Sequence, residues 1–175
     1  RTLRQGRHVK YFLDSEFAER GPQFPIELIS IAIVAEDGRE FYAVSNEFDP
    51  ATCSDWVKTN VLPLLPPKTS PLWMSRAEIR RGVEMFIDEG DTIEIYGFYP
   101  AYDSVVFAQL FGTMADLPSS YPMNIIDLNF LLERHGLSRL ESPEGAHDAL
   151  IDAQWAFRLY QYIKTHINDL YPYGI

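Results

Sequence analysis

The pattern of hydrophobic and polar positions in the first quarter of the chain predicts three β-strands. Apolar side chains dominate residues 9–16, and the run from 26 to 35 is almost continuously apolar and β-branched. A run of that kind is typical of a central strand whose two faces are both covered. Asp37-Gly38 then predicts a hairpin into a third strand over residues 40–45. The three strands are therefore expected to form an antiparallel meander.

Beyond the third strand, the spacing of apolar positions becomes mostly helical. Ser75 and Glu78 have capping-box spacing at the start of a predicted helix over 75–90, which Gly90 would end. The other predicted elements are a strand over 92–98, helices over 55–65, 103–111, 125–135 and 147–166, and a short extended piece near Tyr121. This order predicts an α/β fold in which helices flank a mixed central sheet, made of the antiparallel three-strand meander plus parallel strands.

Composition and length fit one globular domain. The chain has 175 residues, of which 46% are hydrophobic and 23% charged, so it can bury a sizeable core. Residues 1–8 are basic and show no periodicity, and we expect a disordered arm or an artificial remnant there, followed by a single domain over 9–175. No apolar run approaches the roughly 18 residues of a membrane helix, and from the first residues we expect no signal peptide. Because Cys53 is the single cysteine, we exclude a disulfide framework and a thiolate zinc site and expect a cytoplasmic location.

The formal net charge of −10 narrows the nucleic-acid functions open to this chain. A protein that wraps long nucleic acid contacts phosphates through Lys and Arg, so the acidic balance argues against a broad binding groove. It does not argue against phosphodiester chemistry at a chain end, because bound divalent ions would supply positive charge there.

Asp14 and Glu16 form the first candidate site. Side chains two apart on a strand point to the same face, so both carboxylates would leave the end of the first strand close together. Like charges at that distance raise each other's pKa unless a cation holds them, and a hard divalent ion such as Mg²⁺ is the usual solution. Alternating acids on a solvated strand give the same pattern, and the pair alone does not separate the two interpretations.

Two further candidate positions lie at the starts of predicted helices. Asp103 follows the strand over 92–98, at the edge where open α/β sheets bind ligands, although an acid there can also be a simple N-cap. His147 and Asp152 are five residues apart, which separates side chains on an ideal helix by about 140°. They converge only if His147 lies just before the helix, and Asp148 is an alternative acid that spacing does not dismiss.

The order and context of these residues resemble a known family. Asp14-x-Glu16, Asp103 and His147-x-Ala149-x-x-Asp152-Ala153 are similar to the motifs of the Asp-Glu-Asp-Asp-His (DEDDh) exonucleases of the DnaQ-like superfamily, which have a ribonuclease H-like fold. Other stretches are similar to the RNase AS group, the actinobacterial polyadenylate-specific 3'-exoribonucleases; these are residues 26–31, 36–40, 42–45, 47–50, 61–63, 65–67, 72–73 and 75–76. The resemblance extends from Val9 to the last helix and is loose over 119–146 and after Ala153.

The resemblance implies a metal-dependent 3'-5' exoribonuclease that releases nucleoside 5'-monophosphates from RNA 3' ends. The expected partners are a single-stranded RNA 3' end, with poly(A)-like ends preferred, and a second copy of the chain in a homodimer. The resemblance also implies two divalent cations, Mg²⁺ or Mn²⁺. Asp14 would bind both ions, Glu16 and Asp152 would bind the first, and Asp103 would bind the second. His147 would be the general base toward the attacking water.

Four other residues are candidates for substrate contact. Phe17 directly follows the acid pair and can either stack on the terminal base or pack in the core. Tyr102 and Trp73 are further aromatic candidates, and Arg76 is a candidate for phosphate contact.

Three alternatives to an exoribonuclease stay open at this point. A DNA-directed 3'-5' exonuclease of the proofreading or repair type would keep the same five residues, and an endonuclease of the same fold would cut a circular substrate. A non-catalytic nucleic-acid-binding module is disfavoured, because such a protein needs no general base.

Overall fold

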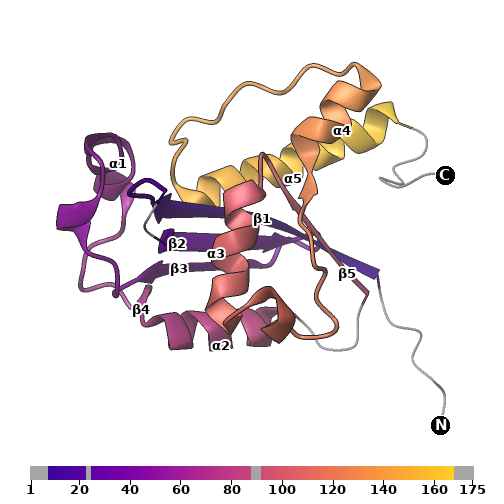
Figure 1. Cartoon of the computed structure of the whole chain (residues 1–175). Helices are drawn as coiled ribbons and strands as arrows, with labels where there is room; N and C mark the ends of the chain where they lie inside the picture. Colours follow the sequence, from indigo (N-terminus) through magenta and orange to yellow (C-terminus); the bar gives the residue numbers. More distant parts are fainter. Residues whose placement is uncertain (1–7, 23–24, 88–91, 168–175) are drawn as a thin grey trace, which may run out of the picture.

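The computed structural model describes residues 8–22, 25–87 and 92–167, and within them six strands form one mixed sheet (Figure 1). The strands are β1 (His8–Ala18), β2 (Glu27–Ala35), β3 (Glu40–Ser45), β4 (Trp73–Met74), β5 (Thr92–Gly97) and β6 (Ile126–Asp127). Their order across the sheet is β4-β3-β2-β1-β5-β6. The first three strands pair antiparallel, and β4, β5 and β6 each pair parallel to a neighbour. The predicted α/β class and mixed sheet are confirmed.

Helices cover both faces of this sheet (Figure 1). They are α1 (Asp55–Asn60), α2 (Arg76–Phe86), α3 (Ala101–Phe111), α4 (Leu128–His135) and α5 (Ala149–His166), with short 3-10 turns at Pro50–Thr52, Leu62–Leu64 and Met114–Asp116. Residues of α2 and α3 pack in one core cluster, and residues of α4 and α5 pack in a second cluster on the other face. A third, smaller cluster joins α1 to the meander.

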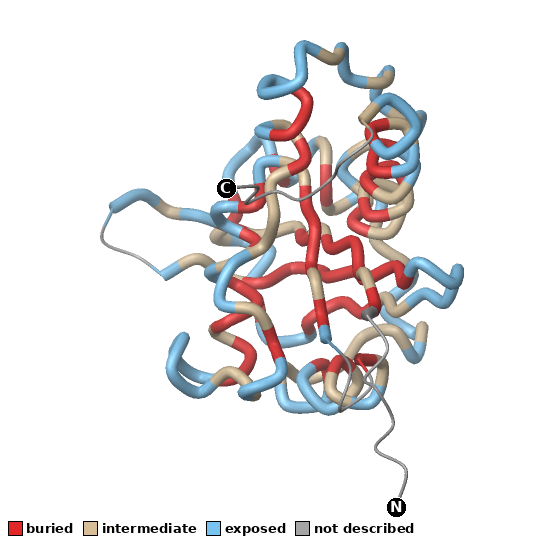
Figure 2. Tube along the Cα trace, turned by 90° about the vertical axis from the view of Figure 1, so that its right-hand side faces the viewer, coloured by how far each residue is buried: buried red, intermediate tan, exposed pale blue. Residues whose placement is uncertain are grey.

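The central strand β1 lies between β2 and β5 and is buried on both faces (Figure 2). Tyr11 and Leu13 belong to the cluster with α2 and α3, whereas Phe12 belongs to the cluster with α4 and α5. Because side chains alternate along a strand, Asp14 and Glu16 continue the α5 face and Ser15 continues the α3 face. This alternation decides which layer each polar residue at the end of β1 meets.

The meander agrees with the sequence pattern almost residue for residue. The third strand spans the predicted residues, and β2 begins one residue later than predicted. Gly38 has a φ of 89° in the connecting turn, and its N–H donates to the carbonyl of Ala35. A positive φ of that size favours glycine, which explains the strength of the Asp-Gly signal. The first strand is longer than predicted, since His8 already pairs with Thr92; the rest of the expected arm, residues 1–7, lies outside the described residues.

Several predicted helix boundaries are wrong for local reasons. The capping box of Ser75 and Glu78 is present, but α2 ends at Phe86, and Gly90 lies outside the described residues. The helix predicted over 55–65 ends at Asn60, shortly before Pro63, whose missing N–H is incompatible with a helix interior.

The segment before α4 also differs from its prediction. Ile126 and Asp127 extend the sheet as β6, so the expected extended piece lies there rather than near Tyr121, and the helix begins at Leu128 instead of residue 125. Asp127 caps α4, because its carboxylate accepts from the N–H of Asn129. No helix in the described ranges is long and apolar enough to cross a membrane.

Candidate active site

Asp14 and Glu16 lie near the carboxyl end of β1, on the face covered by α5. Across the sheet Asp14 pairs with Ala32 and Glu16 pairs with Ser30, and both partners are small. The β1–β2 register shifts directly after Glu16, as in a β-bulge, which ends the regular pairing at this point. The two carboxylates therefore leave the end of the strand on one face, as the sequence predicts.

Asp103 reaches the same strand end from the opposite layer. It lies in the first turn of α3, is only 7% exposed, and accepts from the backbone N–H of Ser15 at 2.8 Å and from the Ser15 hydroxyl at 2.6 Å. The N-cap of α3 is Pro100, so the interpretation of Asp103 as a simple N-cap is wrong. The helix begins at Ala101, two residues earlier than predicted.

The turn before α5 brings His147 and Asp152 together. Asp148 is the N-cap and accepts from the N–H groups of Leu150 and Ile151, so its carboxylate is used in capping. His147 precedes the cap with a φ of 76°, and its backbone N–H donates to Asp152 Oδ2 at 2.7 Å. The helix thus begins two residues later than predicted. His147 lies just before it, as the five-residue spacing requires if His147 and Asp152 are to come together.

All five candidate residues line one pocket of about 310 Å³. Ligand atoms of Glu16, His147 and Asp152 lie within 4.8 Å of one another, the one such group found among the described residues. Asp14 and Asp103 line the same pocket without belonging to that group. The donor set is dominated by carboxylate oxygens, which suits a hard divalent cation.

The electrostatics of the pocket favour the binding of a cation. Burial and the nearby carboxylates of Asp152 and Asp103 raise the pKa of Glu16 to about 8. The pKa of Asp14 is raised well above its ordinary value by burial and by the charges of Asp103 and Glu16. Burial also raises the pKa of Asp103 to about 6, although the hydrogen bonds from Ser15 oppose the shift. These carboxyls cannot all ionise cheaply without a nearby positive charge, which is the behaviour expected of a metal-binding cluster.

Several pocket residues give no signal in the sequence. Trp56 on α1 does not itself line the pocket, but it is 52% exposed and its ring meets that of His147 edge to face, with centroids 4.8 Å apart and planes at 81°. Phe98 packs against Trp155 at 4.9 Å, and Tyr99 beside it has a φ of 54°, which is unusual for a residue with a side chain. Arg139 comes from the connection between α4 and α5. None belongs to a spaced motif, so only the fold reveals their position.

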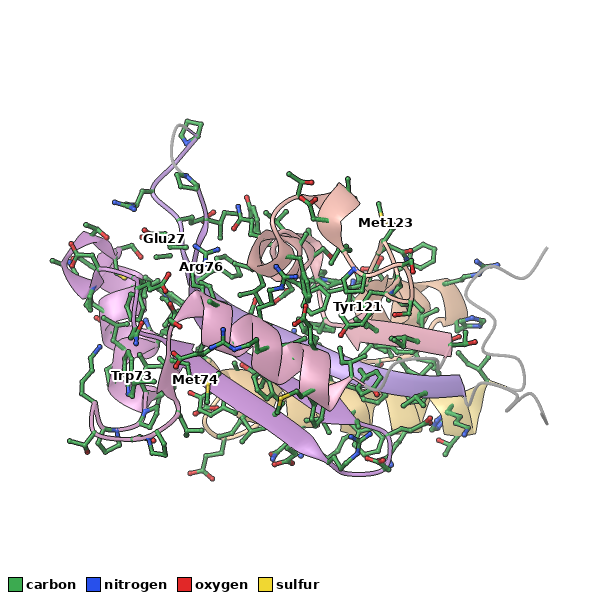
Figure 3. The ribbon with its side chains drawn as sticks, turned by 90° about the horizontal axis from the view of Figure 1, so that it is seen from below. Glu27, Trp73, Met74, Arg76, Tyr121 and Met123 are labelled. Atoms are coloured by element: carbon green, nitrogen blue, oxygen red, sulfur yellow. The ribbon has the colours of Figure 1, made fainter. Side chains whose placement is uncertain are left out.

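The predicted substrate contacts separate into two groups. Phe17 lines the pocket and packs against Tyr102, with ring centroids 5.4 Å apart; Tyr102 itself lines a neighbouring depression. Trp73 and Arg76, both labelled in Figure 3, do not line the pocket: Trp73 packs in the cluster with α1, and Arg76 lies at the start of α2. The ring of Trp73 is covered by the Lys68 ammonium at 3.4 Å, and Arg76 begins α2 with its backbone N–H on Glu47.

Comparison with known proteins identifies relatives along most of the chain. The family described as "3'-5' exoribonuclease Rv2179c-like domain" matches residues 9–164. The 3'-5' exoribonuclease Rv2179c of Mycobacterium tuberculosis (strain ATCC 25618 / H37Rv) is 48% identical over 160 residues, which cover 90% of this chain and 94% of that protein.

Solved structures show the fold. The zinc-bound complex of E. coli ExoI with single-stranded DNA gives a TM-score of 0.62 at 15% identity. The match covers 95% of this chain and 42% of ExoI, so this chain spans less than half of that protein. The 3'-exonuclease that recognises the 3' end of a histone mRNA stem-loop gives a TM-score of 0.60 at 11% identity, covering 92% of this chain and 83% of that chain. The expected ribonuclease H-like fold is confirmed.

We expect Glu16→Gln to raise the free energy of unfolding of the metal-free protein at pH 8 by about 1–3 kcal/mol. The pKa of Glu16 is about 8 in the folded chain and near 4.5 in a free side chain, so the folded state holds the proton more tightly. Stability is therefore lost as pH rises through this window, and an amide, which never ionises, escapes the loss.

Urea unfolding in chelator at pH 4 and pH 8 measures this effect. The gain should vanish at pH 4, where the carboxyl is protonated in both states. Glu19→Gln, an exposed acid just past the same strand, is the matched control and should show no gain. An equal gain at both pH values would contradict the electrostatic cause.

Proposed function

This chain belongs to the Rv2179c-like 3'-5' exoribonuclease family and hydrolyses phosphodiester bonds at RNA 3' ends, and we propose that Asp14, Glu16, Asp103, His147 and Asp152 carry out this reaction with two divalent cations. The observation that carries the assignment is their convergence on one pocket from β1, α3 and the start of α5. The products are a nucleoside 5'-monophosphate and an RNA shortened by one nucleotide.

The carboxylates of Asp14, Glu16, Asp152 and Asp103 are the proposed ligands of Mg²⁺ or Mn²⁺. The raised pKa values of these acids and the oxygen-rich donor set support this assignment. Two bound divalent ions would neutralise the carboxylates and stabilise the negative charge that develops on the phosphate during in-line displacement.

His147 is the proposed general base. Its side chain is exposed at the pocket, and its backbone is tied to Asp152 by the 2.7 Å hydrogen bond. The imidazole accepts a proton from the attacking water as the water oxygen bonds to phosphorus. The bond between phosphorus and the 3' oxygen of the preceding nucleotide breaks, and that oxygen takes a proton from solvent to leave as a 3'-hydroxyl. We assign His147 to proton transfer rather than to metal binding because hard cations prefer oxygen donors.

The finer substrate preference that we propose is a single-stranded, adenylate-rich 3' end. The likeness of the non-catalytic segments to polyadenylate-specific enzymes supports it. Phe17 lines the pocket and packs against Tyr102, so this pair offers an aromatic surface for the terminal base.

We also propose that the chain acts as a cytoplasmic homodimer. A cytoplasmic location is supported by the single cysteine, which is buried. For the dimer, the support is a group of exposed apolar side chains on α3 and the loop after it, namely Tyr102, Val105, Met114 and Met123. Of these, Val105, Met114 and Met123 line a largely apolar cavity of about 220 Å³, which a second copy of the chain would cover.

We expect His147→Ala to lower the turnover of RNA by about 10²–10⁴-fold, because the reaction loses its proton acceptor. Binding of RNA and of the metal should stay within a few-fold of the parent protein. Single-turnover hydrolysis and fluorescence binding in Ca²⁺ measure the two quantities. His135→Ala, at the exposed end of α4, is the matched control. Near-full hydrolysis by His147→Ala would refute the base assignment, and lost metal binding would make His147 a ligand.

The substrate preference predicts that 5'-labelled oligo(A) is shortened about tenfold faster than oligo(U), oligo(C) or oligo(G) of the same length, a discrimination of about 1.4 kcal/mol. A chelator should abolish the activity, and added Mg²⁺ or Mn²⁺ should restore it. Matched DNA oligomers separate the runner-up function, since a proofreading or repair enzyme would degrade them at least as fast. Equal rates on all four RNAs would contradict the adenylate preference but not the exoribonuclease activity.

The dimer predicts a sedimenting mass of about twice the 20.1 kDa of the chain. The double variant Val105→Asp/Met123→Asp should sediment as a monomer, because two buried charges would oppose association at this face. Met85→Asp, on an exposed site of α2, should leave the dimer intact. A parent protein that is monomeric at tens of micromolar would refute the proposal.

A further inference from the structure

The proposed catalytic pocket contains one permanently charged cation. Arg139 is the single Lys or Arg among the residues that line it, in contrast to the carboxylates of Asp14, Glu16, Asp103 and Asp152. Its side chain is exposed, and it forms no ion pair with any residue in the described part of the chain. A guanidinium that borders an acidic pocket without binding one of its acids is free to bind a ligand.

The backbone on both sides of Arg139 is anchored. Leu137 and Leu140 pack against the core formed with α4 and α5. One residue further on, the carbonyl of Glu141 accepts from the indole N–H of Trp155 on α5 at 2.8 Å. Figure 1 shows this connection leaving α4 and running back above α5 to its beginning. The loop is therefore attached along α5, and Arg139 is held at the pocket rather than on a free segment.

The charge balance of the pocket indicates what Arg139 binds. In the proposed function, two divalent ions carry four positive charges and offset four ionised carboxylates. The negative charge of the phosphodiester, and the further charge that forms as the bond breaks, is left without a counter-charge. A guanidinium is always charged, and its planar fork can donate to two non-bridging phosphate oxygens at once.

We propose that Arg139 binds the non-bridging oxygens of the scissile phosphodiester at the RNA 3' end. The inference rests on the proposed catalytic pocket and adds to it the residue that binds the phosphate. Arg76, the sequence candidate for this role, does not line the pocket. Arg139 is thus a substrate-binding residue for the reacting group, with an influence on both RNA affinity and turnover.

Three variants test the assignment. Arg139→Gln removes the charge, Arg139→Lys keeps the charge without the fork, and Arg134→Gln alters an exposed arginine in the last turn of α4 that does not line the pocket. The first readout is binding of oligo(A) in Ca²⁺, in the His147→Ala background, at several salt concentrations. We expect Arg139→Gln to weaken binding about 10-fold and to reduce the slope of log K against log salt by about 0.7, the value for one phosphate contact on a single strand.

The second readout is kcat/KM in Mg²⁺ for the dinucleotide ApA, whose one phosphate is the scissile one, and for a long oligo(A). Arg139→Gln should lower both by a similar factor of about 10–100, with Arg139→Lys between it and the parent protein. A loss on the long RNA alone would overturn the assignment to the scissile phosphate. Binding and turnover equal to those of Arg134→Gln would overturn it entirely.

The remaining outcomes are also distinguishable. If Arg139 only offsets the carboxylates, Arg139→Gln lowers the melting temperature of the metal-free protein at pH 8 and leaves the salt slope unchanged, which refutes the proposal. If Arg139→Gln does not fold, Arg139→Lys decides, because it keeps the charge and a phosphate site still loses the bidentate contact. A parent protein that hydrolyses no RNA would refute the proposed function itself.

Discussion

The hydrogen bonds from Ser15 to Asp103 connect the central strand β1 to the helix α3 beside the acidic pocket. Ser15 lies between Asp14 and Glu16, so its side chain points to the α3 face while theirs point to the α5 face. Its N–H and hydroxyl both donate to one oxygen of the buried Asp103. The contact fixes the start of α3 at the end of β1 and lowers the electrostatic cost of burying a third carboxylate. Without it, nothing described on the α3 side would bring an acid to this pocket.

The same arrangement makes the site a local source of instability. Burial is the largest cause of the raised pKa of Asp14, Glu16 and Asp103, and mutual repulsion of the carboxylates adds to it for the first two. The strand that carries these acids is anchored by side chains such as Tyr11, Phe12 and Leu13, which are almost completely buried between the two helical layers. A strongly packed strand can hold repelling groups at its end because the packing energy of its middle exceeds their repulsion.

How far the sequence predicts this structure depends on the range of the interactions involved. The meander follows from alternation and from Asp37-Gly38, and the start of α2 follows from its capping box, because each of these signals lies within a few residues. β4 and β6 are two residues long, too short to show any periodicity, and they exist because a neighbouring strand offers free backbone groups. The five acidic and histidine positions come from motif order; spacing alone left Asp148 open as an alternative to Asp152, and the structure uses the Asp148 carboxylate as the N-cap of α5.

The pocket residues beyond those motifs show where sequence reasoning stops. Trp73 and Arg76 had the right chemistry for RNA contact, yet from β4 and α2 they do not line the pocket. Arg139 lines it from a segment without a motif, and Trp56 contacts His147 at its side. One connection carries both Arg139 and His147, and Trp155 ties it to α5, which also carries Asp152. The proposed proton acceptor, phosphate ligand and metal ligand therefore share one support, so a shift of that connection relative to α5 would disturb all three together. This coupling gives a structural reason for the hydrogen bond from the Trp155 indole to the Glu141 carbonyl, although Glu141 itself has no proposed role in the reaction.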